Sequence, residues 1–318
     1  MTIKRLLLAA LAAASLSLPA HAQTDELTIM APAGPGGGWD QTARSMQQAL
    51  TEAGLASNVQ VTNVPGAGGT IGIAQFVNNS KGDPKNLIVG GYVMVGAIIA
   101  NQSPVTLADV TPIARLTGEY EGIVVPASSE IKTIGELVEK LKADPGAVSW
   151  AGGSAGGVDH IVVGQIAVAA GVDPTKINYI PFSGGGEALA AILGGQVTAG
   201  VSGTGEWKAQ IDAGEVRLLA VTSAERLEGF DAPTLKESGL DVETQNWRMV
   251  AAPPGISDAD KASLVDTVQK MAESDPWKNI VSQKGWANTF LAGADFETYL
   301  SGEIEKTTAI LKQLGIAQ

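Results

Sequence analysis

The sequence predicts an α/β protein with two doubly wound lobes joined by two crossover segments. Short β-branched runs alternate with glycine-rich loops and helical patterns, which is the order typical of doubly wound sheets. That order occurs in both halves of the 318-residue chain, which is longer than one ordinary domain. Two extended segments, residues 111–126 and 244–255, interrupt the alternation, and we interpret them as crossings between the lobes.

The crossings predict the domain boundaries. Residues 1–22 form a signal peptide, residues 121–249 form the second lobe, and the first lobe is discontinuous, built from residues 23–120 and 250–318. Such a topology leaves a cleft between the lobes and a hinge that can close on a ligand.

The N-terminus has the features of a secretory signal. Lys4 and Arg5 precede an apolar run and then Ala20-His21-Ala22, which matches a cleavage site. The apolar run is too short to span a bilayer, and no cysteine follows it to accept a lipid. We therefore expect cleavage near Ala22 and an exported protein.

In the first lobe, a strand over residues 27–31 enters the first glycine loop, APAGPGGGWD (residues 31–40). We expect Asp40 to cap the helix that follows, because aspartate is a favoured N-cap residue. After the next strand, the second glycine loop, NVPGAGGT (63–70), opens a helix to about Asn79.

In the second lobe, Thr133 and Glu136 fit a capping box that starts a helix. The third glycine loop, WAGGSAGGVD (150–159), and the fourth, IPFSGGGEA (180–188), each join a strand to a helix. Beyond the second crossing we expect two long helices, the first capped by Ser257.

The four glycine loops predict an anion-binding site. Glycine lets backbone N–H groups face a ligand without a Cβ in the way, and the first turn of a helix leaves N–H groups unpaired. One such loop is an ordinary strand-to-helix turn, but four of them, two in each lobe, indicate a cleft that holds a small polyanion.

Charge and composition exclude several classes of partner and site. Lys and Arg total 21 and Asp and Glu 33, and removal of residues 1–22 moves the formal net charge from −12 to −14. Nucleic acid and anionic lipid are therefore poor partners. Cysteine is absent and the mature chain has a single histidine, His160, so we expect no metal and no cofactor.

Enzyme motifs are weak in this sequence. None of the loops has the GK[ST] of a P-loop, and Gly66 to Gly72 is one residue off the dinucleotide spacing. The alternative that stays open is a hydrolase that uses Ser154 or Ser183 with His160, which would lose its activity in His160→Ala.

The glycine loops, together with VRLLAVTSAERLEGF, resemble the solute-binding proteins of tripartite tricarboxylate transporters, the Bug family. The triple glycines of PGGGWD and SGGGEA are similar to those of its tricarboxylate-binding branch. The resemblance covers the mature chain and implies a type II periplasmic binding protein without enzyme activity. It also implies a small carboxylate ligand, held by backbone N–H groups rather than by an arginine.

Transferring the family's site by position gives the candidate ligand-binding residues. They lie in the four loops and at the ends of nearby strands: Gly36, Gly37, Gly38, Trp39, Asp40, Gly68, Gly69, Thr70, Tyr92, Ser154, Ala155, Gly156, Gly157, Ser183, Gly184, Gly185, Gly186, Ser202 and Thr204. Phe182 is a further candidate for the wall of the site, and Arg248 is expected to matter less than the glycines.

The resemblance implies a citrate-like di- or tricarboxylate ligand and delivery to inner-membrane transporter subunits. We expect the protein to be a monomer. A metal-citrate complex is also compatible with the sequence. A receptor that presents its closed form to a sensor kinase would use the same cleft, so membrane partners would have to be captured to separate the two roles.

Overall fold

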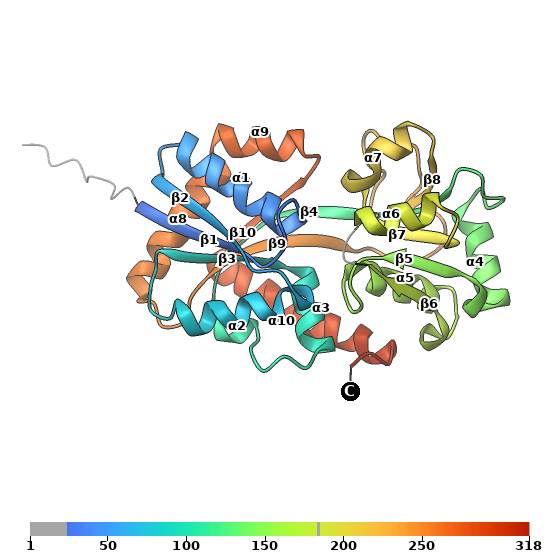
Figure 1. The fold of residues 1–318 in the computed structure, drawn as a ribbon, viewed down its shortest axis with the longest axis horizontal. Helices are drawn as coiled ribbons and strands as arrows, with labels where there is room; N and C mark the ends of the chain where they lie inside the picture. The colour runs from blue at the N-terminus through green and yellow to red at the C-terminus, as the bar shows by residue number, and fades with distance from the viewer. Residues whose placement is uncertain (1–23, 183–184, 318) are drawn as a thin grey trace, which may run out of the picture.

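The chain folds into two lobes that lie side by side, with strands running between them (Figure 1). The computed structural model describes residues 24–182 and 185–317, so the expected signal peptide lies outside the described residues. Within the described ranges, no helix is both long and apolar enough to cross a membrane.

The first lobe begins with strands that alternate with helices, as predicted. Its elements are β1 (Thr24–Ala31), α1 (Gly38–Glu52), β2 (Ala56–Asn63), the short 3₁₀ turn Ala67–Gly69, α2 (Thr70–Asn79), β3 (Asn86–Gly91) and α3 (Tyr92–Ala100). Helix α1 forms because Ala43, Met46 and Leu50 recur at helical spacing, and all three are fully buried.

The second lobe repeats this alternation. Its elements are α4 (Ile134–Ala143), β5 (Ser149–Gly152), α5 (Val158–Ala169), β6 (Asn178–Pro181), α6 (Gly185–Leu193), β7 (Ala199–Gly203), α7 (Thr204–Asp212) and β8 (Val216–Val221). The Thr133 side chain caps α4 by accepting the N–H of Glu136, but the Glu136 carboxylate accepts the N–H of Lys132, so the predicted capping box forms only in part.

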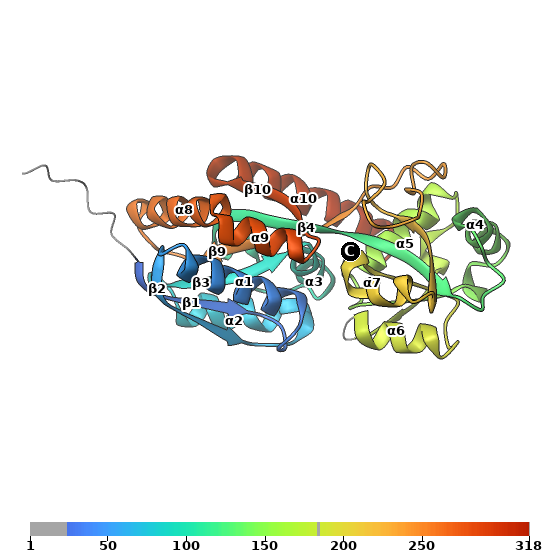
Figure 2. The same cartoon turned by 90° about the horizontal axis from the view of Figure 1, so that it is seen from above.

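One long strand, β4 (Thr111–Pro126), connects the lobes. Residues 111–120 of β4 pair with β9 (Gln245–Ala252), whereas residues 121–126 pair with β7 and β8. The described strands follow the order β2-β1-β3-β9-β4-β7-β5-β6, with β8 and β10 also paired to β4. Figure 2 shows β4 running through both lobes, and the lobe boundaries at residues 120 and 250 stay predictions.

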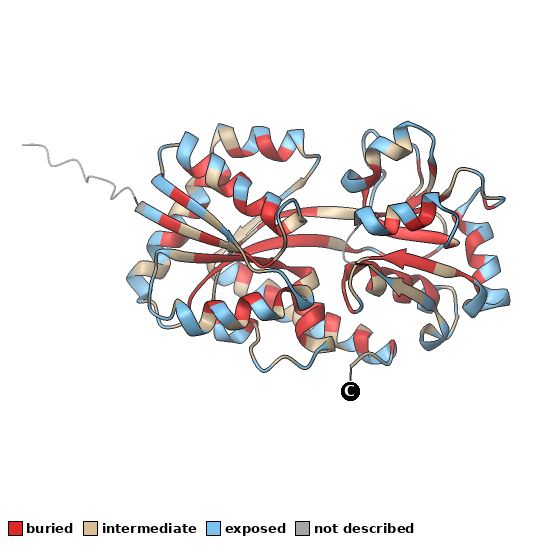
Figure 3. Cartoon of the chain, viewed as in Figure 1, coloured by how far each residue is buried: buried red, intermediate tan, exposed pale blue. Residues whose placement is uncertain are grey.

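The C-terminal segment returns to the first lobe and differs from the two helices expected there. It contains α8 (Asp258–Glu273), α9 (Asp275–Gln283), β10 (Ala287–Ala292) and α10 (Gly293–Gln313). Ser257 caps α8 through a capping box, as predicted, and Ser274 starts the separate helix α9. Buried residues concentrate along β4 and β9, so the core continues between the lobes (Figure 3).

Candidate functional site

The first glycine loop is closed by the side chain of Asp40. The N–H of Gly37 donates to the carbonyl of Gly34 at 3.1 Å. Gly36, at φ +86°, donates its N–H to Oδ2 of Asp40 at 2.8 Å. The N-cap of α1 is Gly37, so the prediction that Asp40 caps the helix is wrong: its carboxylate turns back to the loop instead.

Asp40 receives further donors from outside the loop. Nδ2 of Asn63 lies 2.8 Å from its Oδ1, and Nε of Arg44 lies 3.0 Å from its Oδ2. Burial alone would raise the pKa of this carboxyl, but the hydrogen bonds from Arg44, Gly36 and Asn63 outweigh burial and lower it. Asp40 is therefore an ionised side chain that fixes the first loop.

The third glycine loop repeats this turn with a different acceptor. The N–H of Gly157 donates to the carbonyl of Ser154 at 2.9 Å. Gly156, at φ +76°, donates its N–H to Nδ1 of His160 at 3.2 Å. The imidazole stacks on Tyr179 with ring centroids 4.1 Å apart, and burial lowers its pKa to about 4. His160 is thus neutral at pH 7.

Three of the glycine loops meet around α3. A Cβ on Gly68 of the second loop would clash with Ala97, and a Cβ on Gly69 would lie 2.9 Å from both Met94 and Trp39. On the other side, a Cβ on Gly156 would lie 2.8 Å from the Cβ of Ala100. Helix α3 therefore holds the second loop of one lobe and the third loop of the other within van der Waals contact of itself.

The fourth glycine loop is described in part. Ser183 and Gly184 lie outside the described residues, while Gly185 and Gly186 begin α6. Before them, the N–H of Phe182 donates to the carbonyl of Gly152 at 2.9 Å, which joins this loop to β5. The backbone of Phe182 is thus tied to the strand that enters the third loop.

The predicted N–H donors of the first three loops divide into two groups. Internal hydrogen bonds engage the N–H groups of Gly36, Gly37, Gly69, Thr70, Gly156 and Gly157. No partner among the described residues is assigned to the N–H groups of Gly38, Gly68, Ser154 and Ala155. We therefore regard the second group as the available donors, and their contact with a ligand stays a prediction.

The predicted aromatic and hydroxyl candidates are mostly buried. Trp39 is 8% exposed, and its indole nitrogen has no hydrogen-bond partner among the described residues. The ring of Tyr92 packs against Trp247, and burial raises its pKa to about 12. Ser202 donates to the Glu206 carboxylate at 3.1 Å, and Thr204 begins α7. Trp39 thus adds an unpaired donor beside the first loop.

Arg248 of β9 lies directly beside the first loop, which the sequence did not indicate. A Cβ on Gly38 would lie 2.7 Å from Nη2 of Arg248. The guanidinium, nearly buried, forms a salt bridge with Glu119 at 3.0 Å and donates to the side chain of Asn246. Trp286 also donates to Glu119, at 3.0 Å. The expectation that Arg248 matters less than the glycines stays a prediction.

A second carboxyl, Glu121, lies next to this pair on β4. Glu121 is fully buried, and neither of its carboxylate oxygens has a hydrogen-bond partner among the described residues. Burial, followed by the charge of Asp159, raises its pKa well above the ordinary value. The sequence contained a signal for this pair, because Glu119 and Glu121 stand two residues apart, and side chains at that spacing lie on one face of a strand.

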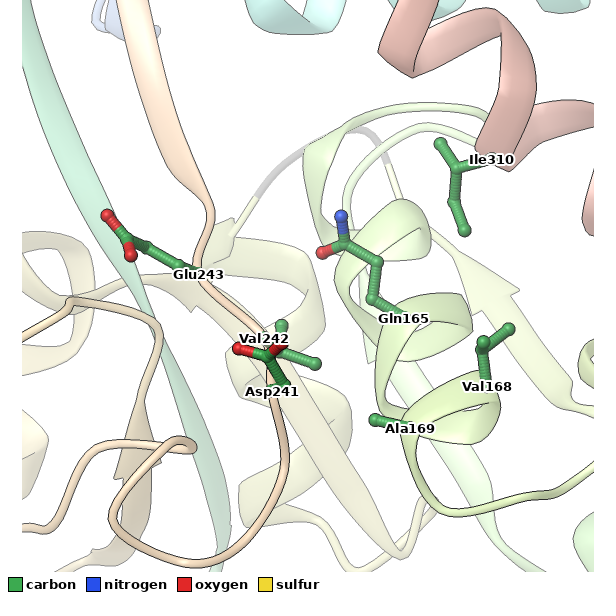
Figure 4. A pocket seen from close by; sticks show the side chains of 7 residues that line it. All are labelled: Gln165, Val168, Ala169, Asp241, Val242, Glu243 and Ile310. Atoms are coloured by element: carbon green, nitrogen blue, oxygen red, sulfur yellow. The ribbon is translucent and has the colours of Figure 1, made fainter.

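Two further observations limit the chemistry of the described residues. They contain no group of three or more acidic or histidine side chains arranged to hold a metal ion. A pocket of about 260 Å³ lies beside α5 and α10 (Figure 4). Its lining includes Gln165, Asp241 and Ile310 but none of the predicted site residues, so it is separate from the glycine loops.

Comparison with known proteins identifies the family. Residues 42–316 match the model of the tripartite tricarboxylate transporter family receptor, TctC. Protein BugT of Bordetella pertussis is 25% identical, over 96% of this chain and 95% of that protein.

Two solved structures share the fold. The periplasmic binding protein BugD has a TM-score of 0.78 at 24% identity, over 92% of this chain and 98% of that one. R. palustris Rpa4515, solved with adipate, has a TM-score of 0.80 at 25% identity, over the same shares. The fold is therefore that of the periplasmic binding proteins, and the chain belongs to the tripartite tricarboxylate transporter receptor family, TctC.

Proposed function

We propose that this protein is an exported solute-binding protein that captures a small di- or tricarboxylate, with citrate as the first candidate, and delivers it to the membrane subunits of a tripartite tricarboxylate transporter. The observation that carries the proposal is the meeting of loops from both lobes around α3. The adipate bound to Rpa4515 supports a carboxylate ligand.

The available donors are sufficient for a useful affinity. A hydrogen bond to a charged group contributes roughly 1.5–3 kcal/mol, and a helix N-terminus adds about 0.3–1 kcal/mol. Micromolar binding corresponds to about −8 kcal/mol. The available donors are the N–H groups of Gly38, Gly68, Ser154 and Ala155 and the indole of Trp39. Before any costs are subtracted, their summed contribution to the binding free energy exceeds the value for micromolar binding. The difference leaves a margin for desolvating the carboxylates.

The geometry of His160 argues against the hydrolase alternative. Its Nδ1 accepts the N–H of Gly156, so the ring proton lies on Nε2 in the neutral form. A general base in a serine hydrolase accepts the nucleophile's proton on one nitrogen while a carboxylate receives the N–H of the other. His160 instead carries its proton on Nε2, the nitrogen that acts as the base in the Ser-His-Asp triad, and the Gly156 N–H holds the ring in this tautomer.

A thermal-shift screen across mono-, di- and tricarboxylates, with and without Mg²⁺, tests the proposal. We expect at least one di- or tricarboxylate to raise the melting temperature in a concentration-dependent way. Gly37→Leu should abolish that shift while leaving the fold intact, because a Cβ there would lie 3.2 Å from the Gly34 carbonyl and would distort the loop.

Gly302→Ala is the control, since a Cβ there meets nothing within 4 Å and the backbone of Gly302 is helical, within α10. The absence of a shift with every carboxylate would overturn the proposal. An undiminished shift in Gly37→Leu would overturn the role of the first loop.

A further inference from the structure

The last helix, α10, is fixed to the first lobe by its N-terminal half. Tyr299 packs edge-on against Trp247 of β9, with ring centroids 5.8 Å apart, and the guanidinium of Arg115 on β4 lies 4.1 Å from the centroid of the same tyrosine ring. Glu303, one turn further along the helix, accepts the indole N–H of Trp247 at 3.2 Å. Figure 1 shows α10 continuing from these strands toward the second lobe.

The C-terminal end of α10 contacts α5 of the second lobe. Leu314, the C-cap residue, is buried, and a Cβ on Gly164 would lie 2.2 Å from its Cδ2. Leu314 therefore occupies the space that a side chain at position 164 would fill. A glycine inside a helix is destabilising relative to alanine, and the close approach of Leu314 explains why α5 has one here.

Two backbone hydrogen bonds order the residues that follow. The N–H of Gly315, at φ +69°, donates to the carbonyl of Lys312 at 3.0 Å, and the N–H of Ile316 donates to that of Leu311 at 2.9 Å. This pair of bonds is the Schellman motif, which ends a helix in a fixed geometry. The motif places Ile316 beside the third glycine loop, where its Cγ2 lies 4.0 Å from the position of a Cβ on Gly156.

We call residues 314–316 the α10 tip, and its contact with the second lobe is short and apolar. One turn before the tip, Ile310 of α10 and Val168 of α5 line the pocket of about 260 Å³ (Figure 4), so packing between the two helices is incomplete there. The tip contributes the side chains of Leu314 and Ile316, and its backbone bonds are internal to α10. It can therefore leave α5 without stripping a hydrogen-bonding group of its partner.

The tip adds a third link between the lobes. The strands β4 and β9 join them through the chain itself, so these links persist when the lobes move (Figure 1). Lobes joined by two strands can rotate about the joining segments. The tip is held to the second lobe by packing alone, so a rotation that moves α5 away from α10 has to break it.

We propose that the α10 tip is a latch that fastens α5 to the first lobe and sets how readily the two lobes part. In the structure the latch is fastened, and the third loop also lies against α3, where a Cβ on Gly156 would lie 2.8 Å from the Cβ of Ala100. Ala100 and Ile316 both border that glycine, so release of the tip removes one of two supports of the third loop. The inference concerns the movement of the lobes and does not depend on the proposed function.

Interlobe distances in the ligand-free protein, measured by double electron–electron resonance, test the latch. The chain has no cysteine, so Glu52→Cys on α1 and Glu139→Cys on α4 place one spin label on the surface of each lobe. Gly164→Ala should release the tip, because the added methyl displaces Leu314 while alanine favours the helical backbone of α5. We expect the fraction of molecules with separated lobes to rise at least about threefold.

Gly302→Ala is the matched control. It makes the same change inside a helix, at a position where the added Cβ meets nothing within 4 Å, and should leave the distances unchanged. Leu314→Ala removes the other side of the contact and should give the same rise as Gly164→Ala, so it serves if that variant fails to fold by circular dichroism. Unchanged distances in either folded variant, or an equal rise in Gly302→Ala, would overturn the latch.

Discussion

The first and third glycine loops have the same turn but close it with different side chains. In each, a left-handed glycine donates its N–H to the residue four positions later: Gly36 to Asp40 and Gly156 to His160. The first closure is an ionised carboxylate with donors from three directions, and the third is a neutral imidazole. The comparison teaches that glycine sets the shape of such a loop. The side chain that accepts the glycine N–H sets how strongly the loop is held and how its stability responds to acid.

Removing Asp40 should have the largest effect. Asp40→Ala removes the acceptor of the Gly36 N–H and one of the two acceptors of the Asn63 side chain, and hydrogen bonds to charged groups contribute roughly 1.5–3 kcal/mol each. We expect a loss of about 3 kcal/mol in the free energy of unfolding, measured by urea denaturation. Asp266→Ala, on the exposed surface of α8, is the control, and an equally small loss in both variants would contradict this role.

The two left-handed glycines should respond unequally to alanine. A non-glycine residue in this region costs roughly 1–2 kcal/mol. A Cβ on Gly36 would meet nothing within 4 Å, whereas a Cβ on Gly156 would lie 2.8 Å from that of Ala100. We therefore expect Gly36→Ala to cost about 1 kcal/mol and Gly156→Ala about 2 kcal/mol in the same assay. Equal costs would show that α3 does not press on the third loop.

Acid should weaken the third loop before the first. The pKa of His160 is lowered from 6.5 to about 4, so the unfolded chain binds its proton first. The His160 contribution to stability is therefore lost as pH falls from about 6.5 to about 4. Asp40 has a lowered pKa and stays ionised through this window.

His160→Gln isolates that contribution, because glutamine can accept the Gly156 N–H but does not titrate. Unfolding free energies of both proteins should be compared from pH 7 to pH 4. Asp159 acts in the opposite direction, since its pKa is raised from 3.8 to about 7 and its contribution is lost as pH rises through that range. The Asp159 contribution is present in both proteins and cancels when their unfolding free energies are subtracted. Identical pH profiles for the two proteins would therefore contradict the role assigned to His160.

The sequence predicted the features that depend on local chemistry. The caps at Thr133 and Ser257, the extended segment that became β4 and the glycine loops all follow from neighbouring residues. Helix α3 was missed because YVMVGAIIA is apolar on every side and has no helical period. It is apolar all round because it packs between loops of both lobes.

The sequence predicted the loops of the candidate site but not the positions of the charged side chains around them. Nothing in the sequence places Arg248 against Gly38, because that contact joins residues far apart in the chain. The position of Asp40 next to the apolar-periodic run predicts a helix cap, and only the fold shows the carboxylate turned back to Gly36. Strand β10 was missed for a similar reason, since its partner is the distant β4.

The continuity of β4 has a consequence for how this protein tolerates insertions. Its pairing partners change between Tyr120 and Glu121, yet the strand itself is unbroken. Because side chains alternate along a strand, one added residue at this point would invert every later position, turning Ile123 and Val125 toward the opposite face of the sheet. Two added residues would preserve the alternation but would shift the register between residues 121–126 of β4 and the strands β7 and β8. The length of this junction is therefore fixed to the residue.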